Sequence, residues 1–197
     1  VRCNAAVSAA NAADALAEAA GWVARGFGCI KVKVGRRSLA DEVALAREIA
    51  ALGDGIAVRW DANGAWQPRE ADVWLQAAAE AGVELVEQPL PADQIEALGA
   101  LAAHVGPVWV GLDESLLRVA HLDRVLRLPP VWCVLKPAVL GGPRATIAIA
   151  RQLRNAGHRV HVTSFVDGAV GRLTAAHVAA AIGGDLPHGL ATGDLLV

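Results

Sequence analysis

The sequence predicts an α/β fold in which strands and helices alternate to form a TIM-like (β/α) barrel, approximately (β/α)7β. Short apolar runs with strand character alternate with Ala- and Leu-rich runs of helical periodicity along the 197 residues. This alternation with short loops implies parallel strands joined by right-handed crossovers. An open nucleotide-binding sheet, the competing architecture, carries a G-x-G-x-x-G turn after its first strand. Residues 8–13 read SAANAA instead, which favours the closed barrel.

The predicted elements follow one another without a linker that would divide the chain. Strand-like runs cover residues 2–7, 29–34, 56–60, 84–87, 108–112, 131–135 and 159–163, with a weaker run at 189–192. Helical runs cover residues 11–25, 39–52, 68–81, 92–103, 117–127, 143–155 and 169–182. Ser38 followed by Asp41 resembles the capping box that begins a helix. We therefore expect residues 1–197 to form a single barrel domain, near the lower size limit of that fold.

The composition excludes several classes of protein. The chain is 54% hydrophobic with a net charge of −2, so nothing in its charge predicts binding to nucleic acid or to an anionic membrane. No apolar run reaches the roughly 18 residues that a membrane-spanning helix needs, and no signal peptide is visible. Cys3, Cys29 and Cys133 are odd in number and widely spaced, which favours a reducing compartment, and we expect a cytoplasmic protein. Because the chain begins at Val1 and contains no methionine, we also expect a piece of a longer product or a processed chain.

Reactive side chains follow six consecutive predicted strands, at the point where each strand ends. They recur at intervals of 23 to 28 residues, about one βα unit each, and are Lys33, Asp61, Glu87, Asp113, Lys136 and Ser164. The carboxyl ends of barrel strands surround one mouth, where barrel active sites are built. The sequence therefore predicts that these side chains meet in one site.

The predicted ring combines three carboxylates with lysines. Carboxylates from three adjacent strands repel one another and take up protons unless a cation lies among them. Oxygen donors without His or Cys suit a hard divalent ion, magnesium before calcium or zinc. Lys31 and Lys33 alternate with Ile30 and Val32, so both ammonium groups point to one face of their strand, across the mouth from Lys136. A lysine whose pKa is depressed by neighbouring cations can remove the α-proton of a carboxylate substrate whose enediolate a metal stabilises.

Each element also has a simpler interpretation. Lys31 and Lys33 suit a half-exposed strand, and Asp61 in WDANG suits a turn. Glu87 in EQPLP can lie in a solvated loop. In LDES either Asp113 or Glu114 can be the residue that points inward, since Glu114 also suits the start of the next helix. Only a shared site explains why all of these residues stand at strand ends with a steady period.

The ordered motifs resemble those of the enolase superfamily, in its branch with paired lysines. The matching stretches are KVKVG, WDANGAW, VEQPL, GLDESL and VLKPAVLGG, and the resemblance runs from the first strand to GLATGDLL at the eighth. Within that superfamily the sequence is most similar to the o-succinylbenzoate synthase family, a branch of menaquinone biosynthesis. The resemblance implies the barrel domain of an Mg²⁺-dependent carbon–oxygen lyase, with Mn²⁺ as a substitute ion. It also implies an N-terminal α+β capping domain, to which no part of this chain corresponds.

The resemblance implies a role for each residue of the ring. Asp61, Glu87 and Asp113 would bind Mg²⁺, and Asn63 would support that site from behind the ligands. Lys33 would remove the α-proton of a cyclohexadiene carboxylate and return a proton to the departing hydroxyl, while Lys136 stabilises the enediolate from the opposite face. Lys31 would lower the pKa of Lys33 and contact the substrate carboxylate. The remaining contacts, to the succinyl end of the substrate, would come from Gly141, Gly142 and Ser164.

The sequence is compatible with three hypotheses of function. The first is o-succinylbenzoate synthesis by dehydration of 2-succinyl-6-hydroxy-2,4-cyclohexadiene-1-carboxylate. The second is a sibling activity that uses the same lysine pair, a muconate-type cycloisomerase or an N-succinylamino acid racemase. The third is a catalytically silent barrel or scaffold. The expected partner is a small carboxylate, with neither nucleic acid nor membrane, and the sequence does not specify an oligomeric state.

Overall fold

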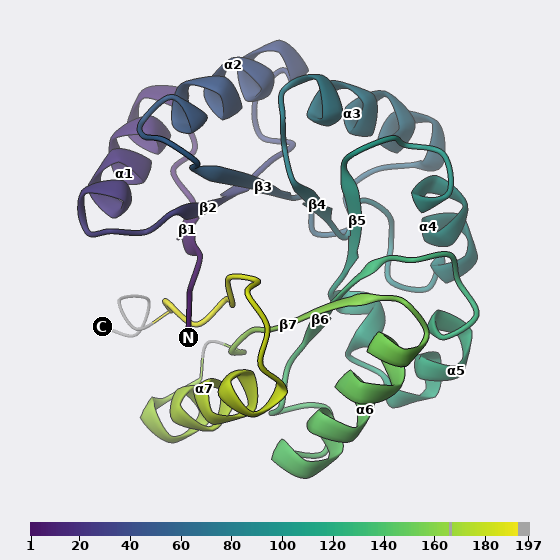
Figure 1. Ribbon diagram of the computed structural model, residues 1–197. Coiled ribbons are helices and arrows are strands. Elements are labelled where there is room, and N and C mark those ends of the chain that lie inside the picture. The colour runs from purple at the N-terminus through teal and green to yellow at the C-terminus, as the bar shows by residue number, and fades with distance from the viewer. Residues whose placement is uncertain (166, 193–197) are drawn as a thin grey trace.

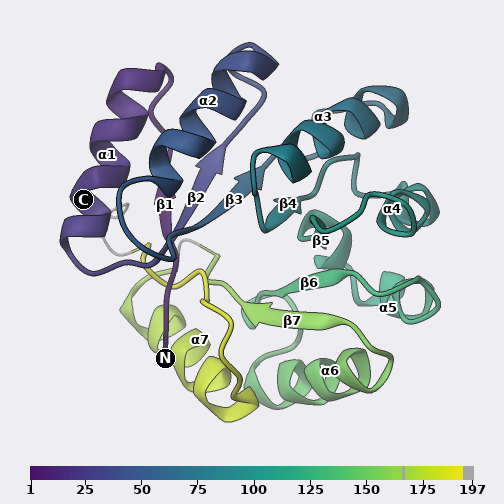
Figure 2. The same cartoon turned by 45° about the horizontal axis from the view of Figure 1, so that its top comes forward.

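The computed structural model describes residues 1–165 and 167–192, and it confirms the α/β barrel. Its strands form one parallel sheet in the order β1-β2-β3-β4-β5-β6-β7, so each strand lies beside the next one along the chain. Figure 1 looks along the barrel, with the strands inside and the helices outside, and Figure 2 shows the same succession after a 45° turn. The carboxyl ends of all seven described strands therefore face the same way, as the predicted site requires.

The elements keep close to their predicted positions. The strands are β1 Ala5–Val7, β2 Cys29–Lys33, β3 Ala57–Asp61, β4 Leu85–Glu87, β5 Trp109–Leu112, β6 Trp132–Leu135 and β7 Arg159–Val162. The helices are α1 Ala12–Ala24, α2 Leu39–Ala50, α3 Pro68–Glu80, α4 Ile95–Ala102, α5 Leu122–Val125, α6 Pro143–Asn155 and α7 Ala169–Ile182. The predicted start of α2 is confirmed, because the Ser38 side chain accepts a hydrogen bond from the backbone N–H of Asp41.

The prediction of one helix over residues 117–127 is wrong for most of that segment. Two 3₁₀ turns, η1 Glu114–Leu116 and η2 Val119–His121, precede α5, which contains only four residues. The segment is held at its start, where the Ser115 hydroxyl donates to the Ala92 carbonyl at 2.9 Å and the Ser115 carbonyl contacts His121 Nδ1 at 2.8 Å. These tertiary contacts outweigh the helical propensity of the segment.

A short seam of two residues takes the place of the predicted eighth strand. His188 forms a bridge to Cys3 beside β1, and Gly189 forms one to Thr163 beside β7. The backbone N–H of Asn4 donates to the His188 carbonyl at 2.9 Å, and that of Gly189 donates to the Val162 carbonyl at 2.9 Å. The strand predicted at 189–192 is thus reduced to this seam, and its continuation from residue 193 lies outside the described residues.

The alternation along β2 decides where its lysines point. Ile30 and Val32 are 0% and 1% exposed and belong to the apolar core between the sheet and the helices. Lys31 and Lys33 point the other way, into the barrel, where both line a cavity at its mouth. The half-exposed strand is therefore excluded. Cys29 and Cys133 are free and buried, as expected of small apolar side chains. Within the described ranges, no helix combines the length and hydropathy that crossing a bilayer requires.

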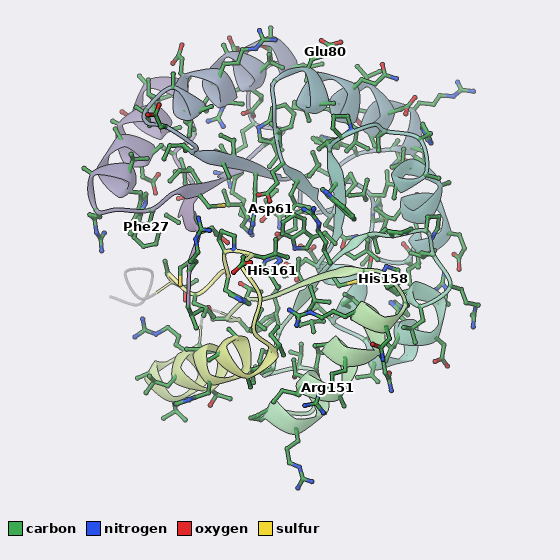
Figure 3. All side chains as sticks on the ribbon, viewed as in Figure 1. Phe27, Asp61, Glu80, Arg151, His158 and His161 are labelled. Carbon is green, nitrogen blue, oxygen red and sulfur yellow. The ribbon has the colours of Figure 1, made fainter. Side chains whose placement is uncertain are left out.

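Below the ring of charges, the barrel interior contains buried polar side chains. Arg59 is 0% exposed, bonds Glu84 through Nε at 3.1 Å and lies 4.6 Å from the ring centre of Trp132. The indole N–H of Trp132 donates to His161 Nδ1 at 2.7 Å. In Figure 3, Asp61 and His161 lie inside the barrel, whereas Glu80 and Arg151 lie on its periphery. His161 is thus a hydrogen-bonded core residue.

Burial of His161 makes stability depend on pH. Burial, then the charges of Arg59 and Lys31, hold the pKa of His161 well below 6.5. The unfolded chain takes up this proton first, so stability falls as the pH drops below 6.5, by about 1.4 kcal/mol per unit for one such group. We expect His161→Gln, which keeps an acceptor for Trp132, to flatten the pH dependence of urea unfolding between pH 6.5 and 5.

The exposed His177 supplies the matched control, and His177→Gln should leave that pH dependence unchanged. The comparison must be made against wild type, because burial raises the pKa of Glu87 to about 7 and so gives this carboxyl a contribution of opposite sign. Equal pH profiles for wild type and His161→Gln would contradict the prediction.

Candidate active site

Strand register places the predicted residues side by side. Lys33 pairs with Asp61 across β2 and β3, and Asp61 pairs with Glu87 across β3 and β4. Glu87 in turn pairs with Gly111 of β5, two residues before Asp113. A Cβ atom at Gly111 would lie 3.0 Å from the Cα of Glu87 and 2.9 Å from the Leu85 side chain, so a glycine is needed for this approach.

The three carboxylates of the ring are buried and paired with lysines. Glu87, Asp61 and Asp113 are 0%, 2% and 6% exposed. The ammonium group of Lys31 lies 2.7 Å from Glu87 Oε1 and 3.0 Å from Asp61 Oδ2. Lys33 lies 2.8 Å from the same Asp61 oxygen, and Lys136 lies 2.7 Å from Asp113. Three lysine ammonium groups therefore lie against three buried carboxyl groups in one layer.

The predicted supporting residue, Asn63, connects two sides of the site. Its backbone is left-handed, with φ 48°, and its N–H donates to Asp61 Oδ1 at 3.2 Å. Its side-chain oxygen accepts a hydrogen bond from Lys33, and its amide nitrogen donates to Glu114 Oε1 at 3.0 Å. Asp113 and Glu114 thus both face the site: Asp113 is paired with Lys136, whereas Glu114 is paired with Asn63.

The pKa shifts follow from burial and from this pairing. Burial is the largest influence on Glu87 and raises its pKa to about 7 against the opposing charge of Lys31. Burial also acts on Asp61, but the ammonium groups of Lys31 and Lys33 outweigh it and lower the Asp61 pKa. Burial disfavours the Lys31 ammonium, yet Glu87, Asp61 and Asp113 raise the Lys31 pKa above its ordinary value. Burial thus favours the protonated form of Glu87, whereas lysine ammonium groups favour the charged form of Asp61.

The carboxylate oxygens of the ring suit a hard cation, although the lysine ammonium groups compete with such an ion for them. In residues 1–165 and 167–192, no group of three or more His, Cys, Asp or Glu side chains converges closely enough to hold a metal ion. The lysine ammonium groups lie against the carboxylate oxygens instead. Glu87 Oε2 is buried and has no hydrogen-bond partner in the described part of the chain. An unpaired buried carboxylate oxygen next to two further carboxylates is a donor set for a divalent ion with oxygen ligands.

One cavity of about 220 Å³ opens onto these side chains. Its lining includes Lys31, Lys33, Lys136 and Ser164 of the predicted set, together with Asn4, Ala6, Thr163, Gly189, Ala191 and Thr192. Ser164 Oγ lies 2.6 Å from Thr192 Oγ1. Gly141 and Gly142 form the turn between β6 and α6 and are not among the described lining residues, so their contact with a substrate stays a prediction.

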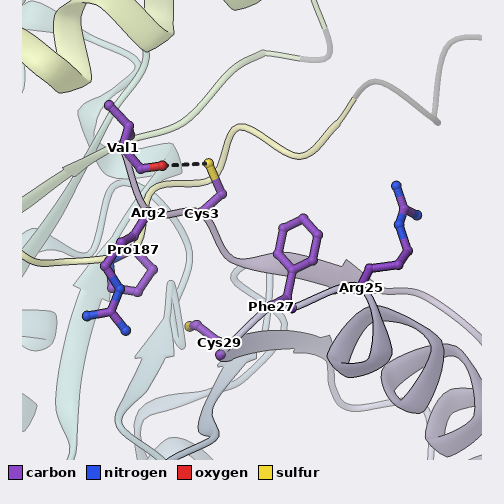
Figure 4. Close-up of a pocket in the computed structure, with 9 residues that line it drawn as sticks. Val1, Arg2, Cys3, Arg25, Phe27, Cys29 and Pro187 are labelled. Carbon is purple, nitrogen blue, oxygen red and sulfur yellow. Dashed lines mark hydrogen bonds between the residues drawn. The ribbon is translucent and has the colours of Figure 1, made fainter.

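A larger cavity, about 470 Å³, lies at the opposite end of the barrel. Figure 4 shows its lining, with Val1, Arg2 and Cys3 ahead of β1, Phe27 ahead of β2 and Pro187 ahead of the seam. This end carries the amino ends of the strands, which in barrel enzymes serves stability. Among the described residues that line it there is neither a carboxylate nor a lysine, so size alone does not locate the chemistry.

Sequence reasoning missed Gln88, which follows Glu87 directly. Gln88 is 0% exposed and adopts a left-handed backbone with φ 44°. Its side chain contacts the segment that carries Asp113. A buried amide between a strand end and a proline gives no period and no charge, so the only signal was its position next to a candidate ligand.

A family profile and curated relatives of known name both match most of this chain. The profile of the family described as "Enolase C-terminal domain-like" matches residues 14–194. The chloromuconate cycloisomerase of Pseudomonas sp. (strain P51) is 36% identical over 161 residues, 81% of this chain and 43% of that protein. The o-succinylbenzoate synthase of Thermosynechococcus vestitus is 36% identical over 159 residues, 78% of this chain and 49% of that protein. The chain therefore spans about half the length of the curated relatives it matches.

A solved structure agrees in fold over nearly the whole chain. MenC from Desulfotalea psychrophila superposes with a TM-score of 0.85 at 28% sequence identity, over 98% of this chain and 55% of that one. The barrel that carries the ring of strand-end residues therefore has the same fold as this solved structure.

Proposed function

The chain belongs to the enolase C-terminal domain-like family, and on that premise we propose that it is the barrel of an Mg²⁺-dependent o-succinylbenzoate synthase. One observation carries the proposal. Carboxylates from β3, β4 and the end of β5 are buried in one layer, and each contacts a lysine ammonium within 3.0 Å at the mouth cavity. This arrangement combines oxygen donors for a hard cation with amines that can move protons.

Asp61, Glu87 and Asp113 are the proposed Mg²⁺ ligands, with Mn²⁺ as a substitute. The bound ion would supply positive charge that stabilises the enediolate when the substrate loses its α-proton. Glu87, whose Oε2 has no described partner, offers a free oxygen, whereas Asp61 and Asp113 must exchange an ammonium contact for the ion. Lys31 keeps a further contact with Asp61 and is placed to bind the substrate carboxylate.

Lys33 is the proposed acid and base. It is 32% exposed, more than Lys31 at 18% or Lys136 at 12%, so its amine is the most accessible of the three from the cavity. As a free amine it takes the α-proton of the cyclohexadiene carboxylate. The resulting ammonium then gives a proton to the hydroxyl group, which leaves as water while the ring becomes aromatic. Lys136, held by Asp113, approaches from the opposite side and supports the developing negative charge as a cation.

The comparisons favour two reactions equally. Relatives named o-succinylbenzoate synthase and chloromuconate cycloisomerase are both 36% identical to this chain. A muconate-type cycloisomerase is therefore the second candidate, with N-succinylamino acid racemisation as a related use of the same lysines. In each case the partner is a small carboxylate, and we place the reaction in the cytoplasm.

The test is an assay of the longest gene product that contains this chain. Dehydration to o-succinylbenzoate is measured with Mg²⁺ and with EDTA. Turnover that depends on Mg²⁺, at roughly 1–10³ s⁻¹, supports the synthase. Lysine-dependent α-proton exchange or cycloisomerisation without dehydration would instead support the second candidate. Silence in every assay would leave a scaffold.

Asp113 and Glu114 compete for the third ligand position, and substitution separates them. We expect Asp113→Asn to weaken Mg²⁺ binding and turnover together, by at least the roughly 10–100-fold that loss of a residue supporting a metal ligand costs, because Asp113 is 6% exposed within the ring. Glu114→Gln should change affinity only a few-fold, since an amide at that position still accepts from Asn63. Calorimetric titration with MgCl₂ measures both, and the reverse ranking would assign the ligand to Glu114.

A further inference from the structure

Gln88 connects the ends of two strands through every polar atom of its amide. Its Oε1 accepts hydrogen bonds from the backbone N–H groups of Asp113 at 2.9 Å and Ser115 at 3.1 Å. Its Nε2 donates to the Leu90 carbonyl at 2.8 Å and to Ser115 Oγ at 2.9 Å. Two donors and two acceptor sites are all that a glutamine amide offers, so its hydrogen-bonding capacity is filled.

The backbone of Gln88 is fixed by the same surroundings. Its N–H donates to the Gly111 carbonyl at 2.8 Å, and its carbonyl accepts from Gly64 at 2.6 Å. A φ of 44° is uncommon for a residue other than glycine and persists only where the surroundings determine it. Gln88 is therefore held rigidly between the loop after β3 and the end of β5.

Asp113 depends on this side chain because it lies beyond the sheet. The strand β5 ends at Leu112, and its last backbone bond to the β4 segment is the one from Gln88 to Gly111. The N–H of Asp113 then bonds the Gln88 side chain in place of a neighbouring strand. The hydrogen bond from the Ser115 N–H to the Gln88 side chain fixes the first turn of η1. That turn sets the direction in which the Asp113 carboxylate leaves the backbone.

We propose that Gln88 is a positioning residue that holds the Asp113 carboxylate where the oxygen ring fits a small divalent ion. The inference rests on the proposed function, in which Asp61, Glu87 and Asp113 bind Mg²⁺. Mg²⁺ requires near-ideal octahedral geometry at about 2.0–2.1 Å, whereas Ca²⁺ accepts irregular ligands at about 2.3–2.6 Å. Loss of the hydrogen bonds between the Gln88 side chain and the Asp113 segment should therefore weaken Mg²⁺ binding more than Ca²⁺ binding.

The experiment measures dissociation constants for MgCl₂ and CaCl₂ by calorimetry, with the longest gene product containing this chain. Gln88→Met keeps the length of the side chain but removes the amide. Its Mg²⁺ affinity should fall about 10-fold or more, and the preference for Mg²⁺ over Ca²⁺ should fall with it. Gln76→Met, the same substitution at an exposed position on α3, is the control and should leave both constants unchanged. A role in stability alone would lower the urea midpoint without changing the Mg²⁺/Ca²⁺ ratio.

A second variant, Gln88→Asn, tests the inference if Gln88→Met does not fold. Gln88→Asn keeps the amide and tolerates a left-handed backbone, but it is one methylene too short to reach both N–H groups. It should shift the ion preference in the same direction. A folded variant of either kind with the wild-type ratio would overturn the inference while leaving the proposed function intact. Failure of the wild-type protein to bind Mg²⁺ would overturn both.

Discussion

Replacing Lys33 with alanine is expected to abolish turnover and α-proton exchange while leaving the affinity for Mg²⁺ within a few-fold of wild type. General acid–base catalysis contributes about 10²–10⁴-fold, and the proposed mechanism uses Lys33 in both proton transfers, so the loss should lie at the upper end. Metal affinity should persist because the substitution leaves all three proposed ligands in place and removes only an ammonium group from Asp61. Solvent deuterium exchange at the α-carbon, measured by NMR, follows the proton transfer, and calorimetry follows the metal.

Lys33→Arg is the matched control for charge. Arginine keeps a cation beside Asp61 but cannot lose its proton near neutral pH. If Lys33 acts as base, the arginine variant should be as inactive as the alanine variant. Retained proton exchange in either variant would refute the assignment of Lys33 as base, and inactivity of the alanine variant alone would reduce Lys33 to an electrostatic role.

The second large effect is expected at Glu87. Glu87→Gln should reduce Mg²⁺ affinity and kcat/KM together, the latter on the order of 10³-fold, since stabilisation by a bound metal is worth several kcal/mol and each 1.4 kcal/mol is a factor of ten. The amide keeps an acceptor for Lys31, which now lies 2.7 Å from Oε1, so the fold should survive. Calorimetric titration and steady-state kinetics on the same preparation measure the two losses.

Glu80→Gln is the control for Glu87→Gln, because Glu80 is an exposed carboxylate at the end of α3. It should leave metal affinity and kinetics at wild-type values. Urea midpoints measured without metal separate a loss of binding from a loss of structure. If Glu87→Gln binds Mg²⁺ normally, the ring is a structural charge layer and the metal site lies elsewhere.

The sequence was sufficient to predict the ring because the ring depends on period alone. Strand ends recur with each βα unit, so Lys33, Asp61, Asp113 and Lys136 could be assigned to one mouth before any contact was known. The pairing of charges could not be predicted in this way. Which carboxylate Lys31 and Lys33 share depends on strand register and side-chain rotamers, and both ammonium groups contact the same oxygen of Asp61.

The errors of the sequence reading have a common physical cause. The segment at 117–127 has helical periodicity, but the long-range bond from Ser115 to Ala92 and the contact between Ser115 and His121 hold its start in 3₁₀ turns. Gln88 carries no charge and no pattern, and only the fold shows that its amide grips the segment after β5. Long-range hydrogen bonds decide both cases, and local propensity does not report them.

The two-residue seam at His188 and Gly189 also bears on the order of folding. The bond from Asn4 to His188 joins residues near opposite ends of the described chain, so bringing them together carries a large loop-closure cost. Contacts of such long sequence separation form slowly, after the local βα units have assembled. Asn4, Ala6 and Gly189 also line the mouth cavity. We therefore expect the cavity wall to form late, so that in refolding the closure of this seam follows the gain of helical content.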